Sequence, residues 1–147
     1  MITRRTVLLS AFVASSVGLA ACSSYMSTNT TALGGDLSAK NEVPMNASAG
    51  TGRADADFNK ETNVLTWKVS YAGLTGPVTA AHIHGPAAAG ANAGVMIPFS
   101  GNLASPFEGK ATLTPAQAAD VLAGRTYVNL HTAANPGGEV RAQLVAK

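Results

Sequence analysis

The clearest pattern along the chain is a strict alternation of apolar and polar residues over residues 64–71. Leu65, Trp67, Val69 and Tyr71 are apolar or aromatic, and Thr, Lys and Ser lie between them. Successive side chains of a strand point to opposite faces, so this run predicts a half-buried antiparallel strand whose polar side meets water.

Shorter runs with the same period recur along the chain, separated by segments rich in Gly, Pro and Asn. The predicted strands are 35–39, 50–58, 64–71, 79–84, 95–99, 107–113, 127–131 and 140–145. A single short helix is predicted at 115–123, because Thr114 and Gln117 form a capping box and Pro115 occupies the first helical position. Strands at this spacing with so little helix indicate an all-β sandwich or barrel.

The histidines are the candidate chemistry of this chain, which has three of them. His82 and His84 share one face of the strand 79–84, while Ala81 and Ile83 take the face that we expect to be in the core. His131 likewise lies opposite the core residues of its own strand. Neutral imidazoles are common ligands of copper, zinc and other transition metals, so the three histidines predict a metal site if their strands meet.

Another interpretation of the histidines is a set of polar surface or edge residues, each hydrogen-bonded to loop backbone. The sequence alone leaves both interpretations open. A thioether from Met45 or Met96 could add a ligand for Cu(I), but we expect both side chains to serve in packing.

The last two predicted strands offer residues that could support the site from behind. A symmetric hairpin pairs their outward residues as follows: His131 with Glu139, Asn129 with Arg141, and Tyr127 with Gln143. In that register the carboxylate of Glu139 can orient the ring of His131, with Asn129 and Arg141 as neighbouring supports. An ordinary cross-strand pair is the alternative.

The first 22 residues read as a secretory signal. Arg4 and Arg5 precede an apolar run over 7–19, which ends in Leu-Ala-Ala-Cys at residues 19–22. This ending resembles a bacterial lipobox, in which the cysteine is lipidated. The run is short for a spanning helix, although an uncleaved anchor is the alternative. The arginine pair fits either a twin-arginine signal or an ordinary positively charged start.

Lipidation at Cys22 would consume the only cysteine and tie the chain to membrane lipid. We expect residues 23–35, which are rich in Ser, Thr and Asn, to be a flexible tether, and residues 36–147 to form one domain. A domain without cysteine has no thiolate zinc site and no cysteine nucleophile.

Charge excludes one class of partner. Loss of residues 1–22 lowers Lys plus Arg from 10 to 8, against 8 Asp plus Glu, so the exported domain is formally neutral. A neutral domain without a basic stripe has no electrostatic footprint for nucleic acid.

Several separated motifs together resemble one family. They are Leu-Ser-Ala-Lys-Asn-Glu-Val-Pro at 37–44, Ala-His-Ile-His-Gly-Pro-Ala at 81–87, Tyr-Val-Asn-Leu-His-Thr at 127–132 and Asn-Pro-Gly-Gly-Glu-Val-Arg-Ala-Gln-Leu at 135–144. This set resembles a chordin (CHRD) domain across nearly the whole predicted domain. The resemblance implies an immunoglobulin-like antiparallel β-sandwich, distantly similar to Cu/Zn superoxide dismutase, and bacterial members that are exported.

The likeness to the dismutase bears on the histidines. The pair His82 and His84 resembles the strand-borne pair of copper ligands in that enzyme, and His131 comes from a late strand, as another copper ligand does there. That enzyme uses four histidines on copper, a separate zinc cluster and a disulfide, none of which three histidines and one cysteine can supply. These departures count against dismutase activity, although a three-histidine copper with an open position keeps it as the only enzymatic candidate, and no catalytic residue is assigned.

These observations together predict an exported, lipid-anchored envelope protein that binds a transition metal through His82, His84 and His131. Copper is favoured, other transition metals remain open, and the expected role is metal handling or sensing. The alternative is a metal-free surface or adhesion module that acts through protein contacts with an unknown partner.

Overall fold

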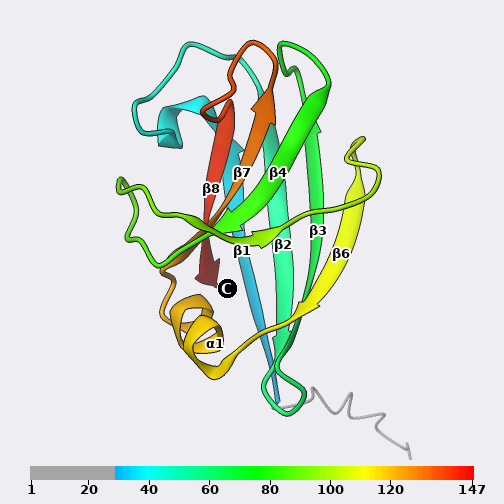
Figure 1. Ribbon diagram of the computed structural model, residues 1–147, viewed down its shortest axis with the longest axis vertical. Coiled ribbons are helices and arrows are strands. Elements are labelled where there is room, and N and C mark those ends of the chain that lie inside the picture. The colour runs from blue at the N-terminus through cyan, green and yellow to red at the C-terminus, as the bar shows by residue number, and fades with distance from the viewer. Residues whose placement is uncertain (1–28) are drawn as a thin grey trace, which may run out of the picture.

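The computed structural model describes residues 29–147 as eight strands, one α-helix and one 3-10 turn (Figure 1). The elements are β1 (Thr30–Ser38), η1 (Ala39–Asn41), β2 (Thr51–Asn59), β3 (Val64–Ala72), β4 (Val78–His84), β5 (Val95–Pro98), β6 (Phe107–Thr112), α1 (Pro115–Leu122), β7 (Thr126–Thr132) and β8 (Val140–Ala146). The prediction of an all-β fold with one short helix is confirmed. No helix within the described residues is long and apolar enough to cross a membrane.

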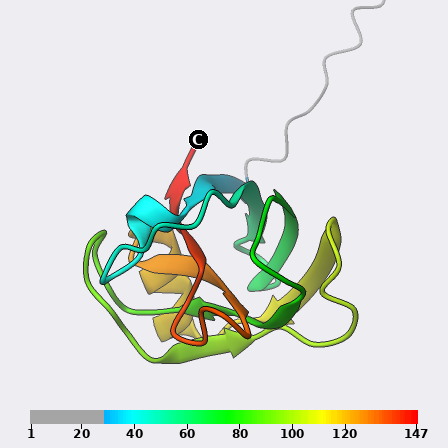
Figure 2. The same cartoon turned by 90° about the horizontal axis from the view of Figure 1, so that it is seen from above.

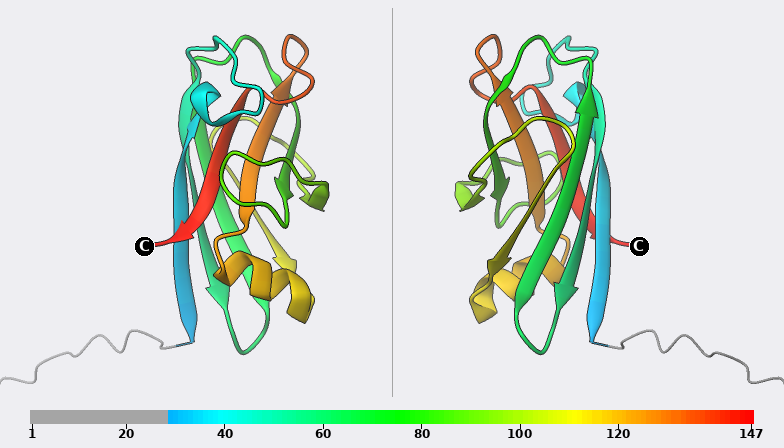
Figure 3. Two further views of the ribbon diagram at one scale, coloured as in Figure 1. Left: turned by 90° about the vertical axis from the view of Figure 1, so that its left-hand side faces the viewer. Right: turned by 90° about the vertical axis from the view of Figure 1, so that its right-hand side faces the viewer.

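The strands form one antiparallel sheet in the order β5-β4-β7-β8-β1-β2-β3-β6. The sheet curls until its two halves face each other, as the view from above shows (Figure 2). Helix α1 lies at one end of the sheet, and the loop between β7 and β8 lies at the other (Figure 3). The expected capping box is present, since Thr114 accepts a hydrogen bond from the Gln117 backbone and Gln117 accepts one from the Thr114 backbone.

The apolar core fills the space between the two halves of the curled sheet. Its most deeply buried members include Leu33, Phe58, Leu65, Val69, Ile83, Leu130 and Leu144. Each such side chain contributes roughly 1.5–3 kcal/mol on burial. Ala81 and Ile83 of β4 and Val128 and Leu130 of β7 all face this core, as their alternation predicts.

Strand β1 begins at Thr30, so the expected tether is wrong for residues 30–35. Leu33 is fully buried, and the whole of β1 pairs with β2. Gly35 allows this packing, because a Cβ there would lie 2.1 Å from the backbone oxygen of Gln143 on β8. A segment poor in apolar residues can therefore be a strand when one leucine and one glycine fit it to its neighbours. The predicted signal segment and Cys22 lie outside the described residues.

Strand β7 is buried on both of its faces, except for its half-buried His131. One face meets the core, and the other lies under the loops 39–50, 85–94 and 133–139. Side chains of β7 and β8 hold the loops 85–94 and 133–139 by hydrogen bonds to the carbonyls of Ala87, Ala91 and Pro136. The face that the sequence predicts to be polar is thus also covered, and the histidines lie on it.

Candidate metal centre

The pairing of β4 with β7 brings the three histidines together. His82 lies opposite Asn129 and His84 opposite Tyr127, while His131 lies opposite Ala80. All three side chains project from the face that is turned away from the core. The predicted convergence on one face is therefore present in the structure.

The histidine nitrogens lie at spacings suited to one ion. One nitrogen from each ring can be chosen so that all three lie within 4.8 Å of one another. Nδ1 of His82 lies 3.2 Å from Nε2 of His131. A tetrahedral ion about 2 Å from each ligand holds two nitrogens roughly 3.3 Å apart, so this pair already has the spacing of bound ligands.

Backbone carbonyls set the orientation of two of the rings. Nδ1 of His84 lies 3.0 Å from the oxygen of Ala93, and Nδ1 of His131 lies 3.0 Å from the oxygen of Pro136. A carbonyl oxygen only accepts, so both Nδ1 atoms carry the proton and both Nε2 atoms carry a lone pair, of which that of His131 accepts a hydrogen bond from Nδ1 of His82. Nε2 of His84 is buried and has no hydrogen-bond partner in the described part of the chain. A buried acceptor without a partner is costly, and a metal ion would satisfy it.

The surroundings favour neutral rings. Burial, followed by the proximity of His131 and His84, lowers the pKa of His82. Burial also lowers the pKa of His84, although the carbonyl of Ala93 works in the opposite direction. A histidine must be neutral to bind a metal, so the site needs little deprotonation at neutral pH.

A stack of side chains supports His84 from behind. Its ring lies parallel to that of Tyr127, with centroids 4.9 Å apart and an angle of 3° between the planes. The guanidinium carbon of Arg141 lies 3.4 Å from the centroid of the Tyr127 ring on β7. The hydroxyl of Tyr127 accepts a hydrogen bond from the backbone of Ala93, the residue whose carbonyl orients His84. Tyr127 therefore positions both the ring and its hydrogen-bond acceptor, a role the sequence analysis missed.

Arg141 fixes the loop that carries Ala93. Its Nη1 donates to Oδ1 of Asn92 at 3.1 Å, and its Nη2 donates to the carbonyl of Ala91 at 2.7 Å. The predicted pairs of Asn129 with Arg141 and of Tyr127 with Gln143 are both present. The recorded contacts of the Arg141 side chain are with this loop and with Tyr127, and none is with a histidine.

Asn129 pairs with Arg141 along the strands as predicted, but its side chain bonds to Glu42. Its side-chain amide donates to a carboxyl oxygen of Glu42 at 2.5 Å. Burial raises the pKa of Glu42 to about 7, although Asn129 and Arg141 favour its charged form. A Cβ on Gly138 would lie 2.7 Å from the Asn129 amide and 2.9 Å from Glu42, so only glycine fits beside this pair. Glu42 is a buried polar residue that the sequence analysis did not single out.

The expected support of His131 by Glu139 is wrong. The Glu139 carboxylate accepts hydrogen bonds from Ser48 at 2.6 Å, from the backbone and hydroxyl of Thr75 at 2.7 Å, and from Thr132 at 2.5 Å. Burial works to raise the pKa of Glu139, but these hydrogen bonds together hold it at about 2. Glu139 precedes β8 and follows Gly138, whose φ of 129° breaks the extended geometry that the predicted register assumes. The carbonyl of Pro136 takes the role that the sequence suggested for Glu139.

The two methionines lie in different surroundings. Met96 packs against the core as expected. Met45 is 71% exposed, so the expectation of a packing role is wrong there.

The comparisons with known proteins gave one finding. The family model described as the CHRD domain matches residues 33–144. No curated protein and no solved structure matches this chain.

Proposed function

The chain belongs to the CHRD-domain family, and we propose that its domain binds one transition-metal ion through His82, His84 and His131. One observation supports this most strongly. Two of the three rings have their Nδ1 atoms tied to carbonyls, so their Nε2 atoms carry the lone pair, and Nε2 of His84 is buried without a partner among the described residues. Surface histidines that serve only as polar residues do not require this arrangement, whereas metal ligands commonly have it.

Copper is the favoured ion. The ligand set consists of imidazoles, which suit copper, zinc, iron and nickel, and Cu²⁺ binds most tightly among the divalent first-row metals. Three protein ligands leave at least one coordination position for water or another small molecule. The metal would supply Lewis acidity or redox chemistry at that position, while the protein orients the ligands.

The proposed setting is the cell envelope. The signal-like segment 1–22 and its lipobox-like ending support export and attachment to membrane lipid through Cys22. A metal site on a tethered domain suits metal handling or sensing outside the cytoplasm. A dismutase-like redox enzyme is the enzymatic alternative.

Elemental analysis tests this proposal. The full chain, purified without a histidine tag, should retain or take up one equivalent of copper or another transition metal. Failure to hold any metal would refute both metal handling and dismutase-like activity, and would leave the metal-free surface module. Bound metal without superoxide consumption would support metal handling alone.

The lipid anchor has its own test. The Cys22→Ser variant should leave the membrane fraction or accumulate unprocessed, because it lacks the thiol that a lipid would modify. The measurement is membrane fractionation together with labelling by a fatty-acid analogue. Unchanged labelling and membrane association in the variant would show that Cys22 is not the anchor.

A further inference from the structure

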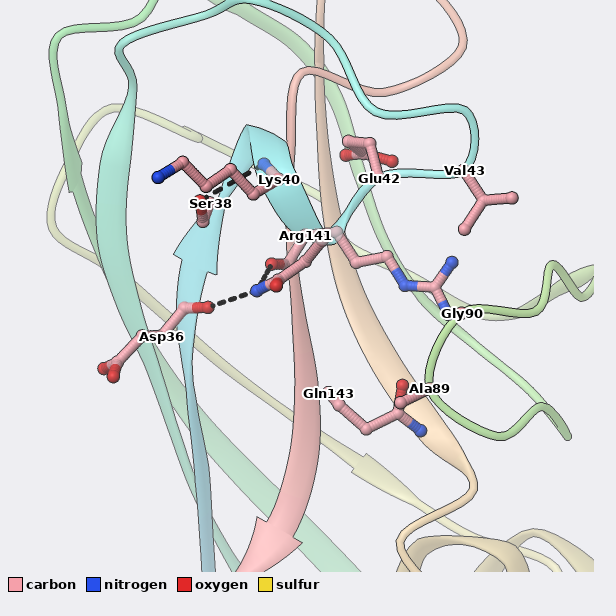
Figure 4. A pocket seen from close by; sticks show the side chains of 10 residues that line it. Asp36, Ser38, Lys40, Glu42, Val43, Ala89, Gly90, Arg141 and Gln143 are labelled. Carbon is pink, nitrogen blue, oxygen red and sulfur yellow. Dashed lines mark hydrogen bonds between the residues drawn. The ribbon is translucent and has the colours of Figure 1, made fainter.

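A cavity of about 610 Å³ lies between η1, strand β8 and the loop 85–94 (Figure 4). Cavities that hold small molecules commonly have about 300–1,000 Å³. Among the residues that line it are Asp36, Lys40, Glu42, Arg141 and Gln143. None of the three histidines lines it, so it is separate from the proposed metal centre.

Arg141 brings a buried positive charge to this cavity. Its side chain is only 1% exposed. A guanidinium has five N–H groups, and the recorded partners of Arg141 within residues 29–147 are two neutral oxygens of the loop 85–94. The ion pairs found in that part of the chain do not include Arg141. The guanidinium also lies over the ring of Tyr127, but no recorded bond within residues 29–147 joins it to an anion, although buried charges are normally paired.

The nearest carboxyl group does not fill this role. Glu42 is hydrogen-bonded to Asn129 and makes no direct bond to Arg141 among those recorded. Burial raises its pKa to about 7, so it is largely neutral below that pH. Burial lowers the pKa of Arg141, while the nearby Tyr127 and Glu42 act in the opposite direction.

Gln143 adds an unused acceptor at the same wall. Its Nε2 donates to the carbonyls of Ala87 and Gly124 at 3.0 and 2.8 Å, which fixes the orientation of the amide. Its Oε1 is buried and has no partner within the described residues. Figure 4 shows Arg141 and Gln143 extending from β8 toward the loop segment with Ala89 and Gly90. One ligand in this space could therefore meet both side chains.

We propose that this cavity binds a small carboxylate that carries a hydrogen-bond donor on the adjacent carbon. The carboxylate would accept from the free N–H groups of Arg141, and the donor, a hydroxyl or an ammonium group, would meet Oε1 of Gln143. Lys40 at the exposed rim adds a positive charge that attracts the anion. Charge-assisted hydrogen bonds to arginine are the stronger kind, and they would provide most of the affinity.

Nuclear magnetic resonance titration of the full chain tests the proposal with three probes of similar size. Lactate carries the hydroxyl, alanine carries the ammonium, and propanoate has neither. Lactate or alanine should bind saturably, with a dissociation constant on the order of 1 mM or tighter. Propanoate should bind about tenfold more weakly, because it leaves Gln143 unsatisfied. Whichever of lactate and alanine binds more tightly identifies the donor.

Variants separate this site from general attraction of anions. Lys40→Gln should weaken binding of the preferred probe about two- to fivefold, since it removes one exposed charge. The matched control Lys110→Gln, on the distant strand β6, should leave binding unchanged. Gln143→Leu should lower the affinity for the preferred probe to that of the unchanged protein for propanoate.

Three results would overturn the proposal. One is the absence of saturable binding by every probe. Another is that propanoate binds with the same affinity as both lactate and alanine. The last is that Lys40→Gln and Lys110→Gln change the affinity for the preferred probe equally. The probe comparison needs no variant, so it stands even if Gln143→Leu does not fold.

Discussion

Strands β4, β7 and β8 carry two buried layers that differ in kind. The face toward the core is apolar, and Ile83, Leu130 and Leu144 are fully buried members of one hydrophobic cluster. The opposite face is polar, and it is covered by loops whose backbone oxygens meet side chains such as Arg141 and His84. The apolar layer is held together by burial that has no preferred direction, while the polar layer depends on individual hydrogen bonds.

The two layers should therefore respond differently to substitution. An apolar side chain in the core can be replaced by another of similar volume at modest cost. A side chain in the polar layer has one geometry in which its partners are satisfied. Changes to the core layer should therefore alter mainly the free energy of unfolding, while changes to the polar layer should alter stability, binding or both, depending on which hydrogen bonds they remove.

The largest expected effect on stability is in the core layer. Leu130→Ala should lower the free energy of unfolding by about 2–5 kcal/mol, because it leaves a cavity at a fully buried position. Urea denaturation measures this change. Leu122→Ala is the matched control, since Leu122 is 41% exposed, and it should cost far less. Equal losses in the two variants would contradict the placement of Leu130 in the core.

Glu139 lies on the same hairpin as Leu130, but it contributes to stability through hydrogen bonds and not through apolar burial. Its pKa of about 2 lies below the ordinary value of 4.5, so its ionised form stabilises the folded state above pH 4.5. That contribution is lost as the pH falls through about 2. Glu139→Gln should therefore cost about 1–3 kcal/mol at neutral pH and progressively less in acid. Urea denaturation at a series of pH values measures the difference.

Two further results define the role of Glu139. The control Glu108→Gln, at an exposed position on β6, should show neither the loss nor its pH dependence. Metal affinity should be unchanged in Glu139→Gln, because its carboxylate is bonded to Ser48, Thr75 and Thr132. A large loss of metal affinity would restore the direct link to His131 that the structure lacks.

Substitution of Tyr127 should change the free energy of unfolding less than the two variants above, and should change metal affinity more clearly. Tyr127→Leu removes the ring stacked on His84 and the hydroxyl that holds Ala93, so metal affinity should fall about 10–100-fold. Competition with a chromophoric chelator measures that affinity. Tyr71→Leu makes the same substitution on β3, away from the histidines, and should leave affinity unchanged. If both variants lose affinity equally, the stack does not position His84.

The sequence predicts the two layers unequally, and the reason is physical. Alternation places Ala81, Ile83, Val128 and Leu130 in the core, because burial of apolar surface leaves a period of two in the sequence. It also places the histidines on one shared face, which the structure confirms. The local pattern was enough to locate these strands, whereas residues 30–35 of β1 are too poor in apolar residues to be predicted from it.

The loops that cover the polar layer leave no such periodic pattern in the sequence. The atoms that orient the rings are backbone oxygens of Ala93 and Pro136, and any residue type has a backbone oxygen. Glu139 was misplaced because the conformation of Gly138 turns the chain just before β8. Glu42 could have been found, since it lies within the Asn-Glu-Val-Pro motif at 41–44, but its partner Asn129 is distant in sequence.

Equilibrium dialysis against copper, followed by elemental analysis, tests the central claim most directly. The full chain should bind one equivalent at neutral pH and lose it only well below pH 6.5, the ordinary histidine value, because burial lowers the pKa of His82 and His84 and protonated histidine cannot bind metal. His84→Ala should lose most of the affinity, since it removes the one side-chain nitrogen in residues 29–147 that is buried without a partner, while the control Thr66→Ala on β3 should bind as the wild type does. Equal copper retention by His84→Ala and the wild type, or no retention by either, would contradict a metal centre at these three histidines.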